Sequence, residues 1–175
     1  MMGSLNMEGL FKIEHWRAGK LLSTYNFKNK ITSKAKEYVL DLALTDDTAQ
    51  RTPWYCGLFT SSFTNFSYDT HPPVISNEFT TYDEAARPEV SFEAATTAGG
   101  YSYVESSIDP YMVFTVSTGV TSTALNGIFV CDAATGAPTY LWSTAAFGNN
   151  NSSPAPITVV AADVLRVQYT VRIAT

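Results

Sequence analysis

The C-terminal stretch from Leu165 to Ile173 constrains the fold of this chain more than any other part of the sequence. Its odd-numbered positions are apolar and its even-numbered positions are polar throughout. An alternation with a period of two is typical of a β-strand that buries one face and exposes the other. The stretch is also rich in β-branched and aromatic residues, which suit a pleated sheet. We therefore predict a core strand of an antiparallel sheet, whose apolar face the rest of the chain must cover.

Seven shorter segments with a strand-like composition precede this stretch. They comprise residues 54–60, 89–94, 101–105, 111–116, 125–131, 140–145 and 157–160. Turn-forming residues separate them, and Ala161-Ala162-Asp163 predicts that the last two strands form a terminal hairpin. A chain of 175 residues is long enough for one domain with a sizeable core. The pattern predicts an all-β fold, an antiparallel β-sandwich or jelly roll of about eight strands.

One helix is predicted at residues 33–44, near the N-terminus. Ala35, Tyr38, Val39 and Leu42 follow the helical spacing and form one apolar stripe. Thr32 or Ser33 can act as the N-cap. We expect this amphipathic helix to cover an open face or an end of the sheet.

Residues 1–30 show no clean period, although they contain several large apolar side chains. We predict an extended N-terminal arm over residues 1–30, followed by a single β-sandwich domain over residues 31–175. The arm contains five Lys or Arg and two Glu, whereas the rest of the chain contains six basic and fourteen acidic residues. A basic arm is expected to lie on its own acidic body or on an acidic neighbour. A solvated segment with an incidental charge bias is the alternative.

The composition argues against several classes of partner. Arg166 and Arg172 are the only basic residues after Pro88, too few to neutralise a track of phosphates, so we expect no nucleic-acid partner. No stretch approaches the ~20 apolar residues that a membrane-spanning helix needs, and the first ten residues lack the apolar run of a signal peptide. Cys56 and Cys131 lie in separate apolar segments, and we expect two buried, reduced thiols.

Candidate catalytic residues are few. The only histidines, His15 and His71, lie in the arm and before two prolines, and neither setting suits a Ser-His-Asp relay. The two cysteines and the two histidines show no metal-ligand spacing, so no metal or cofactor is expected. The six aromatic residues of the strands either line a sugar-binding face or pack in the core or an interface: Tyr101, Tyr103, Tyr111, Phe114, Tyr140 and Trp142.

An acidic cluster between residues 83 and 93 is the best enzymatic candidate. Paired carboxylates on a β-scaffold can hydrolyse glycosides, and the cluster contains Asp83, Glu84, Glu89 and Glu93. Arg87 lies between these carboxylates, and an Arg–carboxylate pair at a loop-to-strand junction is ordinary structural bracing. We favour bracing over catalysis.

Several segments taken in order resemble a known family. They are Leu42-Ala43-Leu44, residues 54–59, 82–88, 126–130, 141–147 and 159–165. This series is similar to small structural proteins of tailed bacteriophages that decorate or cement the capsid, and it covers roughly residues 34–175. One departure is Ala162, where the resemblance would have glycine.

The resemblance implies a β-sandwich or jelly-roll protein that self-associates and binds the outer capsid lattice, with no catalytic residues. Four residues match the family's recurrent bracing segment: Tyr82, Glu84, Arg87 and Pro88. The expected function is a non-enzymatic virion subunit, assembled in the host cytoplasm, whose partners are the major capsid protein and copies of itself as a homo-oligomer. The alternatives are a tail or fibre component that recognises a host surface, and a carbohydrate-active enzyme that uses the acidic cluster.

Contacts with partners are expected from three parts of the chain. These are the arm, the long polar connection at residues 61–88, and the polar face of the last strand, which carries the last two cations. The candidate contact residues are Phe11, Trp16, Arg17, Tyr25, Phe27, Phe63, Phe66, Arg166 and Arg172.

Overall fold

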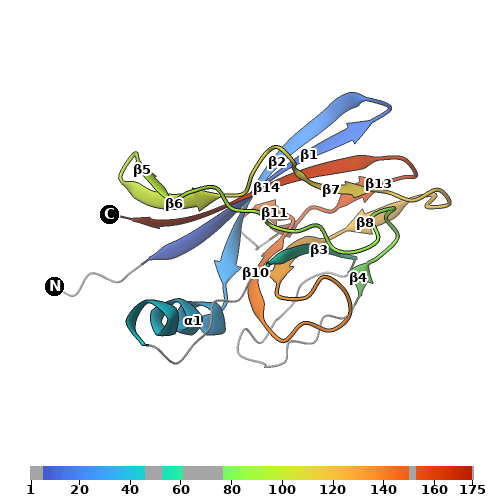
Figure 1. Ribbon diagram of the computed structural model, residues 1–175. Helices are drawn as coiled ribbons and strands as arrows, with labels where there is room; N and C mark the ends of the chain where they lie inside the picture. Colours follow the sequence, from blue (N-terminus) through green and yellow to red (C-terminus); the bar gives the residue numbers. More distant parts are fainter. Residues whose placement is uncertain (1–5, 46–52, 61–76, 150–152, 175) are drawn as a thin grey trace.

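The computed structural model describes residues 6–45, 53–60, 77–149 and 153–174, and most of them lie in antiparallel β-strands (Figure 1). Within this part of the chain the only helix is α1 (Ser33–Leu44). The predicted all-β class is therefore confirmed.

The described residues contain more strands than the sequence pattern predicts. They are β1 (Met7–Arg17), β2 (Lys20–Ile31), β3 (Tyr55–Phe59), β4 (Glu78–Phe79), β5 (Thr96–Ala98), β6 (Tyr101–Glu105), β7 (Met112–Thr115), β8 (Thr123–Leu125), β9 (Gly127–Cys131), β10 (Leu141–Ala146), β11 (Gly148–Asn149), β12 (Ser153–Pro154), β13 (Ile157–Val159) and β14 (Val164–Ala174). The predicted number of about eight is wrong for two reasons. The N-terminal region adds two long strands, and several others have only two or three residues, too few to show a period.

The strands form one large antiparallel sheet and two small ones. The large sheet has the order β4-β3-β9-β10-β2-β1-β14-β6-β5, with β7 also paired to β14, while β11 pairs with β12 and β13 with β8. The sheet passes from one half to the other at β2, which pairs mainly with β1 but meets β10 through Lys30 and Ile31. Phe11 and Tyr169 of one half and Leu58 of the other belong to the same core cluster. The main core therefore draws its side chains from both halves of the sheet.

The predicted core strand at the C-terminus is confirmed as part of β14. Leu165, Val167 and Tyr169 are fully buried, whereas Arg166 between them is exposed. β14 pairs with β1 on one side and with β7 and then β6 on the other. Both edges of β14 are therefore paired, and its apolar face packs in the main core.

The predicted extended arm is wrong for the described residues, and so is the domain boundary after residue 30. β1 and β2 form an antiparallel hairpin, and β1 lies alongside β14 from Met7, opposite Ile173, to Trp16, opposite Val164. Figure 1 shows this hairpin, in blue, beside the red β14 strand. The first strands of the chain are thus central parts of the sheet.

The burial pattern of β1 explains why its sequence shows no clear strand period. Its buried positions alternate and are Met7, Gly9, Phe11, Ile13 and His15. A period of two is therefore present, but Gly9 and His15 interrupt the apolar series. Leu10 and Trp16 lie on the opposite face and hide the alternation further.

Helix α1 begins at the predicted position and packs on the sheet through its first turns. Thr32 is the N-cap, and its Oγ1 accepts a hydrogen bond from the Ala35 N–H at 3.0 Å. Ala35 and Tyr38 are buried, but Leu42 of the predicted apolar stripe is 42% exposed. The C-terminal turns contribute little to the core, because burial in this helix is confined to Ala35 and Tyr38 and partly to Val39.

Two predicted strand features differ in the structure. Residues 89–94 do not form a strand, since only isolated bridges join Glu89 to Tyr55 and Phe92 to Ser106. The predicted terminal hairpin is also wrong, because β13 pairs with β8 while β14 pairs with β1, β6 and β7. Asp163 lies between β13 and β14, and its carbonyl accepts a hydrogen bond from the Val116 N–H at 2.8 Å, while the Ala162 N–H donates to the Val116 carbonyl at 2.9 Å.

The two cysteines lie on neighbouring strands but on opposite faces. Tyr55 is opposite Cys131, and Cys56 is opposite Val130, so the two thiols point to different sides of the sheet. Both are free and buried, as predicted. Burial raises the pKa of Cys131 to about 11 and that of Cys56 well above its ordinary value. Both thiols are therefore unreactive at neutral pH.

Candidate functional site

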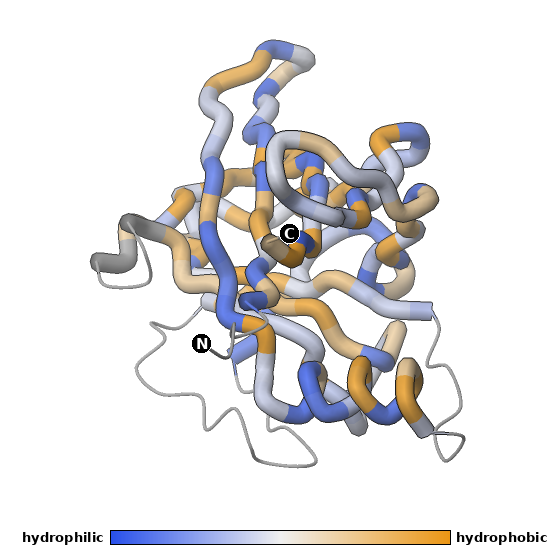
Figure 2. Tube along the Cα trace, turned by 90° about the vertical axis from the view of Figure 1, so that its left-hand side faces the viewer, coloured by the Kyte–Doolittle hydropathy of each residue, from blue (hydrophilic) through white to orange (hydrophobic). Residues whose placement is uncertain are grey.

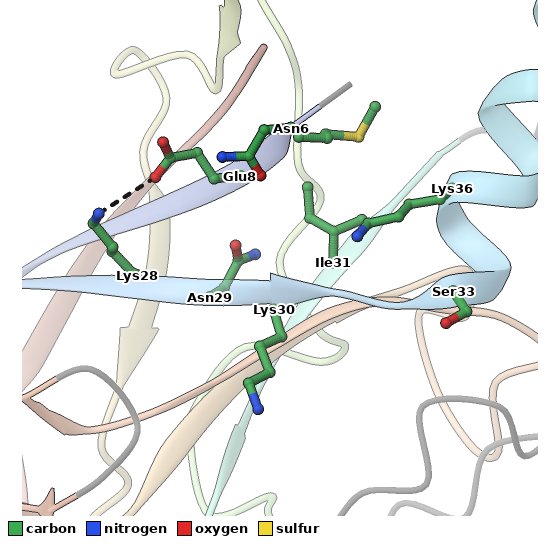
Figure 3. Close-up of a pocket in the computed structure, with 9 residues that line it drawn as sticks. Asn6, Glu8, Lys28, Asn29, Lys30, Ile31, Ser33 and Lys36 are labelled. Atoms are coloured by element: carbon green, nitrogen blue, oxygen red, sulfur yellow. Dashed lines mark ion pairs between the residues drawn. The ribbon is translucent and has the colours of Figure 1, made fainter. Parts of the chain in front are cut away.

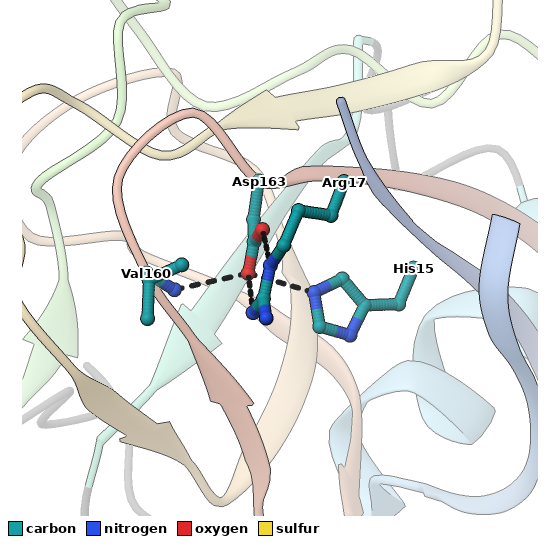
Figure 4. A network of polar contacts seen from close by, with 4 residues as sticks. All are labelled: His15, Arg17, Val160 and Asp163. Atoms are coloured by element: carbon teal, nitrogen blue, oxygen red, sulfur yellow. Dashed lines mark hydrogen bonds and ion pairs between the residues drawn. The ribbon is translucent and has the colours of Figure 1, made fainter. Parts of the chain in front are cut away.

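Asp163 is the centre of a buried polar cluster that joins the two ends of the chain (Figure 4). Its carboxylate accepts a bidentate pair of hydrogen bonds from Arg17, with Nε at 2.6 Å from Oδ1 and Nη2 at 2.8 Å from Oδ2. His15 Nε2 lies 2.8 Å from Oδ2, and the Val160 N–H lies 2.9 Å from the same oxygen. Asp163 is 0% exposed and His15 is 4% exposed. We call these four residues the Asp163 cluster.

The contacts of Asp163 keep it ionised although it is buried. Burial alone would raise its pKa, but the hydrogen bonds from Arg17, from the Val160 N–H and from His15 lower it to about 2. The turn at residues 160–163 and the end of β1 are thereby held together.

None of the four residues of the Asp163 cluster is a serine, threonine or cysteine nucleophile. A catalytic relay needs a nucleophile next to the histidine and access for a substrate. Cavities of about 170, 320 and 380 Å³ occur in the described part of the chain, and neither His15 nor Asp163 lines any of them. The geometry of the Asp163 cluster is that of a structural brace between β1 and the turn before β14.

Arg87 is the centre of a second buried cluster. Its Nε and Nη2 donate to the two carboxylate oxygens of Glu78, each at 2.7 Å. Nη1 donates to the carbonyl of Ala133 at 2.6 Å, and Nη2 donates to that of Gly136 at 2.7 Å. The guanidinium carbon also lies 5.5 Å from the centre of the Phe129 ring. Arg87 therefore ties β4 and the loop after β9 together.

The other three residues of the predicted bracing segment also make internal contacts. Both carboxylate oxygens of Glu84 accept from the Thr115 N–H, at 2.9 and 3.1 Å. The Tyr82 ring meets Phe114 edge-on at 5.2 Å, and burial raises its pKa to about 12. The Pro88 carbonyl accepts from the Cys56 N–H at 2.9 Å. The ion-pair partner of Arg87 is Glu78, which lies outside the acidic cluster at residues 83–93. The bracing prediction had expected a carboxylate of that cluster.

Two of the predicted partner contacts are core residues, so the prediction is wrong for them. Phe11 is 1% exposed and stacks on Tyr169 at 4.4 Å. Phe27 is 7% exposed and stacks on Phe147 at 4.8 Å. Both side chains lie on the inward face of the β1–β2 hairpin. The prediction of an extended arm gave these residues no inward face. Phe63 and Phe66 lie outside the described residues.

The remaining predicted contacts lie at or near the surface. Arg166 lies over the rings of Trp16, at 4.8 Å, and Tyr111, at 5.9 Å. Arg172 lies over Tyr101 at 4.3 Å and also pairs with Glu8 at 3.3 Å. We call Trp16, Tyr101, Tyr111, Arg166 and Arg172 the outer face. Both cations of the outer face therefore lie against aromatic rings, the arrangement of a cation–π contact.

Arg17 and Tyr25 complete the predicted contacts. The Arg17 side chain is 44% exposed at the end of β1, although its guanidinium is bound to Asp163. Tyr25 is half-buried and stacks on Phe27 at 6.0 Å.

The tip of the β1–β2 hairpin is one of the exposed apolar parts of the described residues, which also include Leu40 and Leu44 of α1. Leu21 and Leu22 are 42% and 44% exposed. Figure 2 shows the hairpin extending above the rest of the fold, with hydrophobic and hydrophilic residues along it. β2 pairs with β1 over this region, and in the part of the chain that the structure describes its other edge has no strand neighbour until Lys30. The hairpin therefore presents two exposed leucines beside an open strand edge.

The described residues contain no group of three or more His, Cys, Asp or Glu side chains placed to hold a metal ion. α1, the helix that the described residues form, is too short to cross a membrane. No family model matches the chain, and no curated protein matches it.

Proposed function

We propose that this chain is a non-enzymatic structural protein that acts through protein–protein contacts, as a decoration or cement subunit of a bacteriophage capsid. Its partners in this proposal are the major capsid protein and further copies of itself. The proposal places it in the virion, after assembly in the host cytoplasm, and includes the finer fold prediction of a jelly-roll type of β-sandwich.

The observation that carries the proposal is the protruding β1–β2 hairpin. Exposed leucines beside an unpaired strand edge are costly for an isolated protein, because they invite association with other chains. The same features are useful in a protein that must bind neighbours in many copies on a symmetric shell. Strand addition at such an edge supplies backbone hydrogen bonds, and the leucines supply apolar contact area.

The internal hydrogen bonds of four polar side chains support the same proposal. His15, Asp163, Glu84 and Arg87 are all bound to other parts of the fold. Because Glu84 binds the Thr115 N–H through both oxygens, the geometry does not favour it as a glycosidase acid. The carbohydrate-enzyme alternative receives no comparable support.

Copy number on the particle tests the proposal directly. Quantitative mass spectrometry of purified virions should find hundreds of copies of this chain. A few to a few dozen copies would instead indicate the tail or fibre alternative, and absence from the particle would contradict both.

A binding experiment tests the role of the hairpin. A Leu21→Ser, Leu22→Ser double variant should keep its fold and bind shells about tenfold more weakly, since apolar contact residues dominate such interfaces. Leu40→Ser with Leu44→Ser is the matched control, because both leucines are exposed on α1. Equal binding by the two variants would show that the hairpin is not the contact.

A further inference from the structure

One edge of β2 lies open in the part of the chain that the structure describes. β2 pairs with β1 in an unbroken register from Ser23 to Asn29, but its other edge meets β10 only at Lys30 and Ile31. The stretch from Ser23 to Asn29 is as long as an ordinary β-strand. A further strand of that length can therefore add to the sheet at this open edge.

The backbone groups that face the open edge belong to even-numbered residues. Thr32, just after β2, donates its N–H to the Trp142 carbonyl of β10 at 3.0 Å. Because backbone groups alternate between the two sides of a strand, those of Thr24, Asn26 and Lys28 point to the same side as this N–H. All three residues are exposed, and β1, on the opposite side, is the strand that the described residues pair with them. The edge thus presents N–H and C=O groups that are ready to form a ladder.

The charged residues of β2 are all basic. β2 contains Lys20, Lys28 and Lys30 and no acidic residue, in a chain whose formal net charge is −5. Glu8 lies 3.5 Å from Lys28, but the Lys28 side chain remains 59% exposed. Figure 3 shows Lys28 directed toward Glu8 and Lys30 directed away from it. A strand that adds to this edge is therefore favoured if it carries carboxylates.

The neighbouring row of β1 does not offset this positive charge. Lys12 is opposite Asn26, and Glu14 is opposite Thr24. Lys12 and Glu14 pair with each other at 3.0 Å, so their charges compensate locally. The excess charge at the open edge therefore comes from the lysines of β2.

The same lysines disfavour a second copy of β2 as the occupant. Lysines on an edge strand oppose pairing between identical edges, because like charges are brought together. The inward face of the edge adds a second requirement. Tyr25 is half-buried there and stacks on Phe27 at 6.0 Å, so apolar side chains at alternate positions of an added strand extend this face.

We propose that the open edge of β2 binds an extended acidic segment of a partner protein, in which apolar residues alternate with polar ones. The backbone of this segment bonds to Thr24, Asn26 and Lys28, and its carboxylates lie near the β2 lysines. The inference rests on the proposed function of the hairpin as a contact surface, and it specifies the chemistry of the partner at that surface.

Three capped peptides of about nine residues test the proposal when each is titrated into the full chain. In the first peptide valine alternates with glutamate, and in the second valine alternates with lysine. The third is the first peptide with proline in place of its inner valines, so that its charge is kept but its strand is broken. The first peptide should bind with a Kd below roughly 1 mM, and the other two at least about tenfold more weakly.

Amide hydrogen exchange distinguishes strand addition from simple charge attraction. With the first peptide at saturation, the N–H groups of Thr24, Asn26 and Lys28 should exchange at least about tenfold more slowly. Those of Tyr25 and Phe27 already face β1 and should change little. Unchanged exchange at the three even-numbered residues, or equal binding by the peptide that contains proline, would overturn the proposal.

Charge variants show whether the lysines of the edge select the acidic segment. Lys20→Gln with Lys28→Gln should weaken binding of the first peptide about tenfold or more. Lys34→Gln with Lys36→Gln removes the same charge from α1 and should leave the Kd within about twofold. Equal losses in the two double variants would overturn the proposal.

The copy number on virions separates this inference from the proposed function. If virions contain hundreds of copies but the first peptide does not saturate the chain up to about 5 mM, only the acidic-segment inference is overturned. If the first peptide binds as expected but virions lack the chain, the binding edge is supported and the capsid role is contradicted.

Discussion

At the scale of single residues, Asp163 has a role that nothing near it in the sequence indicates. Its neighbours form a turn, whereas the side chains that bind it lie 146 and 148 positions earlier, in β1. Sequence spacing cannot report such a contact. In the structure one carboxylate satisfies a histidine, an arginine and a backbone N–H, and thereby fastens the first strand to the last turn.

Replacing Asp163 by Asn should lower the free energy of unfolding by about 2 kcal/mol at pH 7, because Arg17 and His15 lose their anionic partner. The folded-state pKa of about 2 lies below the ordinary value of 3.8. The ionised form therefore stabilises the fold above about pH 4, and this contribution is lost as the pH falls toward 2. In urea unfolding, the wild type should have a higher free energy of unfolding than the variant at pH 7. This excess should be about 1 kcal/mol smaller at pH 3. Asp83→Asn, a matched change at an exposed carboxylate, should lower the free energy of unfolding at pH 7 much less than Asp163→Asn.

Ala162 has a backbone conformation that favours glycine. Its φ is 64°, in the left-handed region, where a Cβ atom costs roughly 1 kcal/mol. Ala162→Gly should therefore raise the free energy of unfolding by up to about 1 kcal/mol in thermal or urea unfolding. Ala161→Gly, in the same turn but without a positive φ, should be destabilising. A stability loss in both variants would contradict the argument.

At the scale of elements, the contact between β3 and β9 depends on one glycine. Gly57 is opposite Phe129, and a Cβ atom on Gly57 would overlap the Phe129 ring. That ring is fully buried, and Phe59 packs on it at 4.6 Å. The aromatic side chain therefore occupies the space that the glycine leaves free on the neighbouring strand.

Gly57→Ala should destabilise the protein by roughly 2 kcal/mol or more, because the buried ring has no room to move. In a Phe129→Leu background the same change should cost clearly less, since the overlapping ring is gone. Urea unfolding of the four proteins of this double-mutant cycle gives the coupling. Additive effects would show that the ring is not what excludes the Cβ atom.

At the scale of the whole molecule, the N-terminal hairpin holds the sheet together. β2 is the strand through which the two halves of the large sheet connect, and β1 covers one edge of β14. Phe11, Ile13 and Phe27 contribute from this hairpin to the main core. A chain without these strands would expose the apolar face and one edge of β14.

Deleting residues 1–30 should therefore abolish folding. Loss of the buried aromatic and aliphatic side chains of the hairpin alone costs several kcal/mol, comparable to the total stability of a typical domain. The truncated chain should lack the cooperative thermal transition and the near-ultraviolet circular dichroism of the full chain. The Leu21→Ser, Leu22→Ser variant should retain both, because it changes only exposed residues. A folded truncated monomer would contradict the central position of the hairpin.

The sequence alone was sufficient for the all-β class, for the start of α1 and for β14, because each depends on a local period that burial of one face imposes on neighbouring residues. It also singled out Arg87 as a brace, although the structure alone identifies Glu78 as its partner. The role of β1 was obscured, because glycine and histidine occupy inward positions there and need partners from distant strands. Only the tertiary structure could pair His15 with Asp163, place the Asn29 amide over Gly9 and separate β13 from β14. These arrangements depend on contacts between residues far apart in the chain, where neither charge nor periodicity along the sequence carries information.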